Sequence, residues 1–297
     1  MKLKKMLALT MAAVLAAGLT ACGSSAATSA APAAESTADA AGAPDGDGDP
    51  TTLTVAMECA YAPYNWTQSD DSNGAVAIRG SSDYAYGYDV MMAKKIGEAL
   101  GQQVQIVKLD WDSLIPAVMS GDVDCVIAGQ SITAERAAQV DFSNPYYYAS
   151  IVTLTKKDSA YANAASVADL AGATATSQLG TIWYDTCLPQ IEGAQLMPAS
   201  ETAPAMVMAV TSGTVDYICT DMPTAMGACA TYDNLVILDF SGSEDNFQVD
   251  AGEINIGISV VKGNTTLLDA MNAVLSGMTV EDMNQIMNEA IAVQPAI

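Results

Sequence analysis

An arginine and an aspartate occupy similar places in two stretches of the sequence, each at the start of a helix expected after an apolar strand. Arg136 follows the strand expected over 123–128, and Asp221 follows the apolar run 217–219. A guanidinium binds a carboxylate through two parallel hydrogen bonds, and an aspartate binds an ammonium group. If the two residues face one space, they can hold a zwitterion such as an α-amino acid.

Each residue also has an ordinary structural interpretation. Arg136 could be a surface arginine, although a cation in the first turn of a helix opposes the helix dipole by about a few tenths of a kcal/mol. Asp221 could be a simple N-cap before Met222 and Pro223, which is a common use of aspartate. The charges of Arg136 and Asp221 therefore favour a ligand-binding site, while both structural interpretations stay open.

The elements around these residues predict two α/β lobes. Strands are expected over 53–57 and 104–109 and helices over 88–100 and 113–119, an alternation typical of a parallel sheet. The phrase Met119-Ser-Gly-Asp-Val-Asp124 is matched by Thr211-Ser-Gly-Thr-Val-Asp216, each before an apolar strand. Ligands bind beyond the carboxyl ends of strands in such sheets. We therefore expect the strand ends of both lobes to face one cleft.

The N-terminus predicts export and lipid anchoring. Three lysines precede a short apolar run, too short to span a bilayer as a helix, so residues 1–21 are expected to be a signal peptide. Leu19-Thr-Ala-Cys22-Gly resembles the bacterial lipobox, which implies cleavage before Cys22 and acylation of its thiol, with palmitate as one acyl group. The alternative is an ordinary cleavage site followed by an incidental cysteine. Residues 22–50 lack aromatic and long aliphatic side chains, so they predict a disordered tether.

Composition excludes several function classes. The formal net charge of −23 makes nucleic acid and anionic lipid headgroups poor partners. The sequence contains no histidine, which removes imidazole-based metal sites and histidine-dependent catalytic triads. We expect no cofactor, no metal site, a monomer, and contact with the membrane through the N-terminal lipid alone.

Five cysteines follow Cys22, an odd number without any C-x-x-C spacing. Several fall in apolar runs, which indicates buried thiols. A disulfide between Cys219 and Cys229 remains an open alternative in an extracytoplasmic protein.

Between Leu53 and about Met278 the sequence resembles the type-2 periplasmic binding proteins for polar amino acids. The resemblance rests on the order and spacing of several motifs, each weak alone. These motifs are Leu53-Thr-Val-Ala-Met-Glu-Cys-Ala-Tyr-Ala-Pro-Tyr64, Tyr86-Gly-Tyr-Asp-Val90, Trp111-Asp-Ser-Leu-Ile-Pro-Ala117, Ser120-Gly-Asp-Val-Asp124, Thr133-Ala-Glu-Arg136 and Asp141-Phe-Ser-Asn-Pro-Tyr146.

This resemblance implies a two-lobed α/β fold in which each lobe is a mainly parallel sheet flanked by helices. Lobe 1 would comprise residues 51–151 and 255–297, and lobe 2 residues 152–254. Hinge crossings are expected near 151–155 and 251–256. The implied function is a solute-binding protein at the extracytoplasmic face of the bacterial cell membrane. It would capture a polar or basic L-amino acid and deliver it to the permease and ATPase of an ABC importer.

The resemblance also assigns roles to individual residues. Arg136 would pair with the ligand carboxylate and Asp221 with its ammonium group, while Tyr61 and Trp111 would bracket the side chain. The full set of expected ligand-binding residues is Glu58, Tyr61, Trp111, Ala128, Gly129, Ser131, Arg136, Gln178, Thr181 and Asp221.

The remaining members of this set have more local roles. Ser131 and the backbone of residues 128–129 would bond the ligand head, Gln178 and Thr181 would act from lobe 2, and Glu58 would lie beside the distal end. Taken without the resemblance, the two aromatic residues are equally explained as core side chains and Thr181 as a turn residue.

Three features depart from the family pattern. Ala134 replaces a proline, residues 67–86 form a longer segment that carries Arg79 and could touch the ligand, and the helix expected over 280–291 lacks the usual ending. An acidic ligand is disfavoured because it would meet Glu58.

We expect no enzymatic activity. The competing function is a cyclohexadienyl-dehydratase-like enzyme on the same fold, with Glu58 as its acid. A second alternative is the receptor domain of an amino-acid sensor, which would need a transmembrane or signalling segment that this sequence does not show.

Overall fold

A computed structural model describes residues 49–295. The predicted signal peptide, Cys22 and nearly all of the tether lie outside these residues. Within the described range, no helix combines the length and the apolar character needed to cross a membrane.

The first sheet has the strand order β6-β1-β7-β16-β8. Strand β1 pairs in parallel with β6 and β7, whereas β16 is antiparallel to β7 and β8. The sheet is therefore mixed, because β16 belongs to the chain segment that returns from the second sheet. The strands are β1 (Thr52–Met57), β6 (Gln103–Lys108), β7 (Cys125–Val126), β8 (Val140–Phe142) and β16 (Ser259–Val261).

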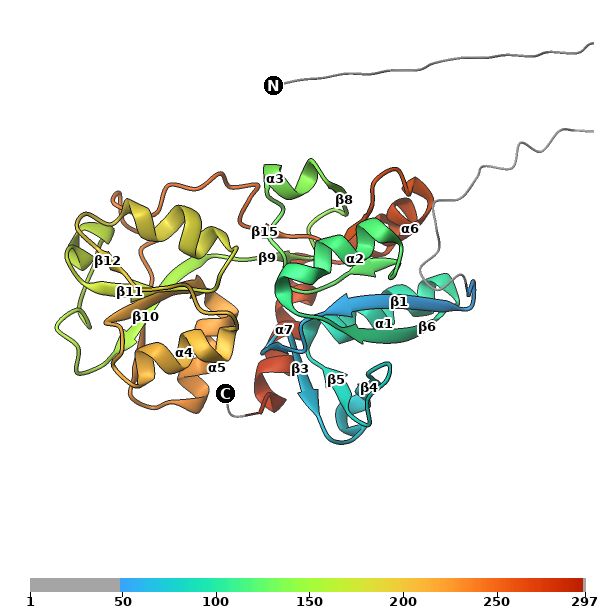
Figure 1. Cartoon of the computed structure of the whole chain (residues 1–297), viewed down its shortest axis with the longest axis horizontal. Helices are drawn as coiled ribbons and strands as arrows, with labels where there is room; N and C mark the ends of the chain where they lie inside the picture. The colour runs from blue at the N-terminus through green and yellow to red at the C-terminus, as the bar shows by residue number, and fades with distance from the viewer. Residues whose placement is uncertain (1–48, 296–297) are drawn as a thin grey trace, which may run out of the picture. The chain divides into compact units, whose positions relative to one another are not determined.

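Helices from the first half of the described chain and from its C-terminal end accompany this sheet (Figure 1). The helix expected over 88–100 is α1 (Tyr88–Leu100), and the one expected over 113–119 is α2 (Leu114–Ser120). Near the C-terminus lie α6 (Thr265–Ser276) and α7 (Val280–Val293). Helix α7 begins with a capping box between Thr279 and Asp282. It contacts both α1 and α5 (Met222–Thr231). The helix therefore packs against the protein although its sequence lacks the family's usual C-terminal ending.

The second sheet repeats this plan with the order β12-β11-β13-β10-β14. Again the strand pairings on one side of β13 are parallel and those on the other side are antiparallel. Its elements are β10 (Ile151–Lys156), β11 (Thr174–Thr176), β12 (Gln195–Leu196), α4 (Ala203–Thr211), β13 (Tyr217–Asp221), α5 (Met222–Thr231) and β14 (Leu235–Leu238). Short 3-10 turns occupy Val167–Leu170 and Leu188–Gln190, and a π-helical turn occupies Trp183–Cys187.

The phrase repeated in the sequence has one structural role in both lobes. Asp124 accepts hydrogen bonds from the backbone N–H and hydroxyl of Thr54 at 2.7 and 2.6 Å. Asp216 accepts the same pair from Thr174 at 2.8 and 2.6 Å. In each lobe the aspartate thus ties the start of one strand to its parallel neighbour, which aligns the carboxyl ends of those strands.

The chain passes from the first sheet to the second between β8 and β10 and returns between β14 and β16. On these passages β9 (Tyr147–Tyr148) and β15 (Asn255–Ile256) pair as an antiparallel ribbon. The lobe boundaries and the hinge ranges predicted from the sequence stay predictions, although the ribbon offers a physical basis for the hinge.

The longer segment 67–86 belongs to a small antiparallel sheet. It combines β2 (Ala60–Tyr61), β3 (Asn65–Gln68), β4 (Val76–Ala77) and β5 (Tyr84–Tyr86), with a 3-10 turn at Ser72–Gly74. Arg79 is exposed, and its backbone N–H bonds Ile106 while its guanidinium lies 3.5 Å from Gln105. The segment therefore attaches Arg79 to the outer strand β6 and does not bring it to the cleft.

The five cysteines of the described region are free thiols. The expectation of buried thiols is met by four of them, and Cys229 is half-buried. The thiol beside Cys219 is that of Cys187, so the open alternative of a Cys219–Cys229 disulfide does not describe this structure.

Candidate functional site

The first lobe presents an acidic turn and an aromatic ring at the end of β1. Glu58 and Tyr61 are 5% and 4% exposed. Between them Cys59 has a left-handed backbone with φ of 54°, which turns the chain sharply out of the strand. The Tyr61 ring stacks on Tyr64 with centroids 4.9 Å apart, so packing fixes its orientation.

The expected helix at Arg136 is a single turn, α3 (Ala134–Ala137), and its N-cap is Thr133. The Thr133 hydroxyl accepts the N–H of Arg136 at 3.2 Å. The Arg136 guanidinium lies 5.3 Å from the Trp111 ring centroid. It is therefore held by a cation–π contact, while one of its nitrogens donates to the second lobe and another to its own lobe.

Gly129 follows β7 in the chain and lies against the Tyr61 ring. Its φ is +64°, and a Cβ atom there would stand 2.7 Å from the Tyr61 ring. Both the backbone conformation and the close approach thus require glycine. Ala128 is buried beside it.

The second lobe contributes a turn and a helix start. Thr181 closes the turn by donating its hydroxyl to the Gln178 carbonyl at 2.7 Å. Asp221 ends β13 and caps α5, accepting the Thr224 N–H at 2.8 Å. The ordinary N-cap function considered for Asp221 is therefore real, and the remaining question is what else its carboxylate binds.

Three contacts join these groups across the cleft. Gln178 Nε2 lies 3.2 and 3.4 Å from the two Glu58 oxygens, the Tyr61 hydroxyl donates to Asp221, and Arg136 donates to the Gly180 carbonyl at 2.9 Å. Within its own lobe Arg136 also donates to the Ser131 carbonyl at 2.9 Å.

Residues from both lobes enclose a cavity of about 10 Å³, roughly the space of one water molecule. Its lining residues are Tyr61, Trp111, Gly129, Ser131, Arg136, Gln178, Thr181 and Trp183. Seven of the ten predicted residues therefore line one space. Glu58 and Asp221 stand behind it and each bonds a lining residue, while Ala128 is not among the lining residues. An amino acid can enter only if the cross-cleft contacts open.

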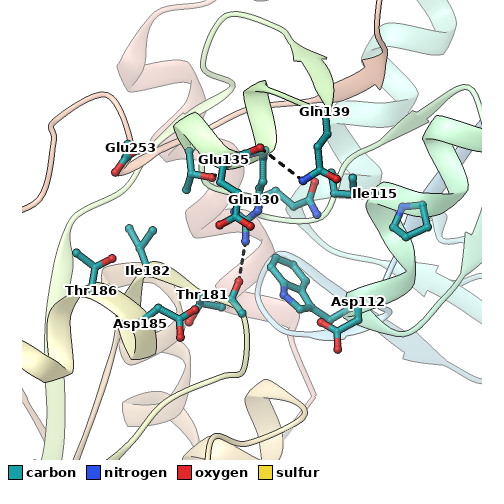
Figure 2. Close-up of a pocket in the computed structure, with 15 residues that line it drawn as sticks. Asp112, Ile115, Gln130, Glu135, Gln139, Thr181, Ile182, Asp185, Thr186 and Glu253 are labelled. Carbon is teal, nitrogen blue, oxygen red and sulfur yellow. Dashed lines mark hydrogen bonds between the residues drawn. The ribbon is translucent and has the colours of Figure 1, made fainter.

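A larger pocket of about 530 Å³ has Arg136 in its wall and is lined by residues of both lobes. Figure 2 shows Glu135 and Glu253 on one side of this pocket and Asp185 on the other, with Asp112 near its edge. Four carboxylates around one guanidinium give the entrance a negative potential, which attracts cationic solutes.

Burial controls the protonation of the inner groups. Removal from water raises the pKa of Glu58 to about 7, and Asp110 adds to the rise while Gln178 and Lys108 oppose it. Burial also raises the pKa of Asp221, although hydrogen bonds from Thr224 and Tyr61 favour its charged form. Burial lowers the pKa of Arg136, but a guanidinium remains protonated in proteins.

Sequence reasoning missed Trp183 and Gly180. Trp183 is 4% exposed and lines the inner cavity, and the Gly180 carbonyl accepts from Arg136. Both lie close in the sequence to Gln178 and Thr181, so proximity in the sequence was an available signal. In the part of the chain that the structure describes, no group of three or more acidic or cysteine side chains could hold a metal ion.

Comparisons with known proteins agree with this geometry. Residues 53–291 match a family model described as bacterial extracellular solute-binding proteins, family 3. The arginine-binding extracellular protein ArtP of Bacillus subtilis (strain 168) is 34% identical over 44% of this chain and 45% of its own length. The match thus spans less than half of that relative.

Two solved structures share the fold. An ancestral arginine-binding protein bound to arginine is 29% identical, with a TM-score of 0.63 over 80% of this chain and 97% of that one. An ancestral amino-acid-binding protein described as a precursor of cyclohexadienyl dehydratase is 28% identical, with a TM-score of 0.65 over 81% of this chain and 96% of that one.

Proposed function

This chain belongs to the bacterial extracellular solute-binding proteins of family 3, and on that basis we propose that it captures a polar or basic L-amino acid between its lobes. It would then deliver the ligand to the permease and ATPase of an ABC importer. The observation that carries the proposal is the placement of Arg136 and Asp221 on opposite sides of one cleft, beside Tyr61 and Trp111.

The ligand head fits the groups that now bond one another. The guanidinium of Arg136 donates to two backbone carbonyls, and a ligand carboxylate is a stronger partner because the bond is then charged on both sides. Asp221 accepts from the neutral Tyr61 hydroxyl, and an ammonium group would in the same way offer it a charged donor. Binding therefore exchanges weaker internal contacts for stronger ones.

The distal end of the ligand would meet Glu58. This buried carboxyl has an amide, Gln178, as its hydrogen-bond partner and forms none of the ion pairs found among residues 49–295. A cationic ligand side chain would supply the missing charge, and the acidic entrance favours the same class. We therefore favour a basic amino acid such as L-arginine over a neutral one, and disfavour glutamate and aspartate.

The dehydratase alternative has one observation in its favour. A pKa of about 7 for Glu58 suits a general acid, and one structural neighbour is a precursor of such an enzyme. That neighbour is itself an amino-acid-binding protein, so we propose binding and no catalysis. Incubation with arogenate and prephenate, followed by product analysis, tests this directly, and turnover of either compound would overturn the proposal.

Native mass spectrometry of the purified protein is the first test of capture, since a carried-over ligand adds its mass. Isothermal titration with L-arginine, L-lysine, L-histidine, L-glutamine and L-glutamate then ranks the classes. We expect the basic amino acids to bind most tightly and glutamate least. Failure of all natural L-amino acids to bind would contradict the proposed function.

Anchoring is a separate proposal that rests on the lipobox-like sequence before Cys22. The Cys22→Ala variant lacks the thiol that would carry the lipid, so we expect it to leave the membrane fraction. Continued fractionation of Cys22→Ala with membranes would contradict lipid anchoring without affecting the binding proposal.

A further inference from the structure

A buried carboxylate lies directly behind the ligand-facing turns of lobe 1. Asp89 is the second residue of α1 and its side chain is 0% exposed. It takes part in none of the ion pairs found among the described residues. The helix dipole favours a carboxylate here, but that gain is smaller than the cost of removing the charge from water. Helix stability alone therefore does not account for Asp89.

Four buried hydrogen bonds run through Asp89 from one turn to the other. On one side the Cys59 N–H donates to Asn65 Oδ1 at 2.7 Å, and Asn65 Nδ2 donates to Asp89 Oδ2 at 2.7 Å. On the other side the Gly129 N–H donates to the Tyr146 hydroxyl at 2.9 Å, which donates to Asp89 Oδ1 at 2.6 Å. Both arms thus donate toward the carboxylate.

These four hydrogen bonds form a relay between two turns, of which the one at Cys59 is strained. Cys59 and Gly129 both have a left-handed backbone, with φ of 54° and 64°, and left-handed conformations are costly for residues other than glycine. The turns follow β1 and β7, which are adjacent parallel strands. A link between them fixes the distance from Glu58 and Tyr61 to the backbone at Gly129.

We propose that Asp89 is a positioning residue whose carboxylate holds the turn at Glu58–Cys59 and the turn at Ala128–Gly129 at the spacing required for ligand binding. The inference deepens the proposed function and rests on it for its effect on affinity. Its structural part, the coupling of the two turns, stands independently of the ligand.

The relay requires a carboxylate at this position. Two donors converge on Asp89, and only an ionised carboxyl accepts at both of its oxygens. The Asp89→Asn variant presents one acceptor and one donor, so it cannot accept from both arms. Burial raises the pKa of Asp89 to about 7, while the hydrogen bonds from Tyr146 and Asn65 favour the charged form.

Hydrogen–deuterium exchange of the ligand-free full chain reads the relay directly. In Tyr146→Phe we expect the amide of Gly129 to exchange about tenfold faster or more, since it loses its acceptor. In Asp89→Asn we expect a similar increase in at least one of the two turns. Tyr88→Phe is the matched control, because it removes another fully buried hydroxyl, which donates to the Tyr146 carbonyl and not to the relay.

Affinity for L-arginine is the second readout. We expect Tyr146→Phe and Asp89→Asn to weaken binding about tenfold, and Tyr88→Phe to weaken it less than threefold. In the double variant the losses should fall short of additive, because both changes cut one path. A role limited to general stability would lower the melting temperature and raise exchange throughout lobe 1.

The outcomes separate the two proposals. Equal exchange at Gly129 in Tyr146→Phe and Tyr88→Phe, with both folded by circular dichroism, overturns the positioning role. If Asp89→Asn does not fold, Tyr146→Phe decides the question. Failure of the wild-type protein to bind any amino acid overturns the proposed function, while the exchange data still decide whether the relay couples the turns.

Discussion

The two sides of the cleft are built in different ways from the same plan. The lobe 1 side consists of rings, a guanidinium, a strained turn at Cys59 and a glycine turn at Gly129, held by a buried polar relay and by stacking between Tyr61 and Tyr64. The lobe 2 side consists of the turn at Gln178–Thr181 and the N-cap of α5. Local hydrogen bonds fix the Gln178 carbonyl and the Asp221 carboxylate. The difference indicates that lobe 1 shapes the site and lobe 2 completes it on closure.

The largest expected effect comes from removing the cation of lobe 1. Arg136→Ala leaves the ligand carboxylate without a compensating charge in a closed cleft, at a cost of roughly 3–5 kcal/mol. We expect affinity to fall about 100- to 3000-fold. Arg136→Lys should also bind poorly because it lacks the planar fork. Isothermal titration measures both, and a loss below tenfold in Arg136→Ala with an intact fold contradicts the clamp.

The next largest effect should come from the anion of lobe 2. Asp221→Asn can still cap α5 but loses the charge that would bind the ammonium group. We expect a loss of about 10- to 100-fold, from roughly 1.5–3 kcal/mol per charged hydrogen bond, with little change in stability. Asp221→Ala adds the loss of the cap, about 1 kcal/mol of folding free energy. Titration together with thermal unfolding separates these two contributions, and unchanged affinity in Asp221→Asn would place the ammonium group elsewhere.

A pH series tests the acidic group of lobe 1. The free protein holds a proton on Glu58 below about pH 7, and a bound cation would favour the carboxylate, so binding releases that proton. Affinity for L-arginine should therefore rise with pH, by up to about tenfold per pH unit below 7, and level off above it. The Glu58→Gln variant should show a flatter profile. An equally steep profile in both proteins would assign the pH dependence to another group.

The smallest effect concerns the aromatic wall. The chain has three tryptophans, of which Trp111 and Trp183 line the inner cavity. We expect Trp111→Phe to lose part of the ligand-induced fluorescence change and to weaken binding a few-fold, because a smaller ring gives a weaker cation–π contact. Trp66→Phe is the control, since Trp66 is not among the residues lining that cavity. An unaltered signal in Trp111→Phe would exclude this wall from ligand contact.

The sequence predicted those features that depend on local pattern. The helix over 88–100 matches α1 at both ends, and the duplicated phrase marks equivalent aspartates in both lobes. The strand expected over 123–128 is shortened to β7, and the antiparallel strand in each sheet was not predicted, because both features depend on pairing with strands far away in the chain.

The same limit applies to the candidate site. The order of the motifs predicted seven of the residues that line the inner cavity. It did not predict which groups bond these residues there. Gly180 acts through its carbonyl, which every residue possesses, so its type carries no signal. Asp89 was recognised as part of a motif, whereas its link to Gly129 through Tyr146 exists only in the folded chain.

The three contacts across the cleft have a consequence for transport. Because Glu58, Tyr61 and Arg136 bond partners on the opposite lobe, these internal contacts by themselves favour closure. An importer that recognises closure would then meet empty carriers, which occupy its docking site and compete with loaded ones. Cargo must therefore stabilise closure well beyond these internal contacts, and strengthening them would slow uptake even while the cleft keeps its full set of binding groups.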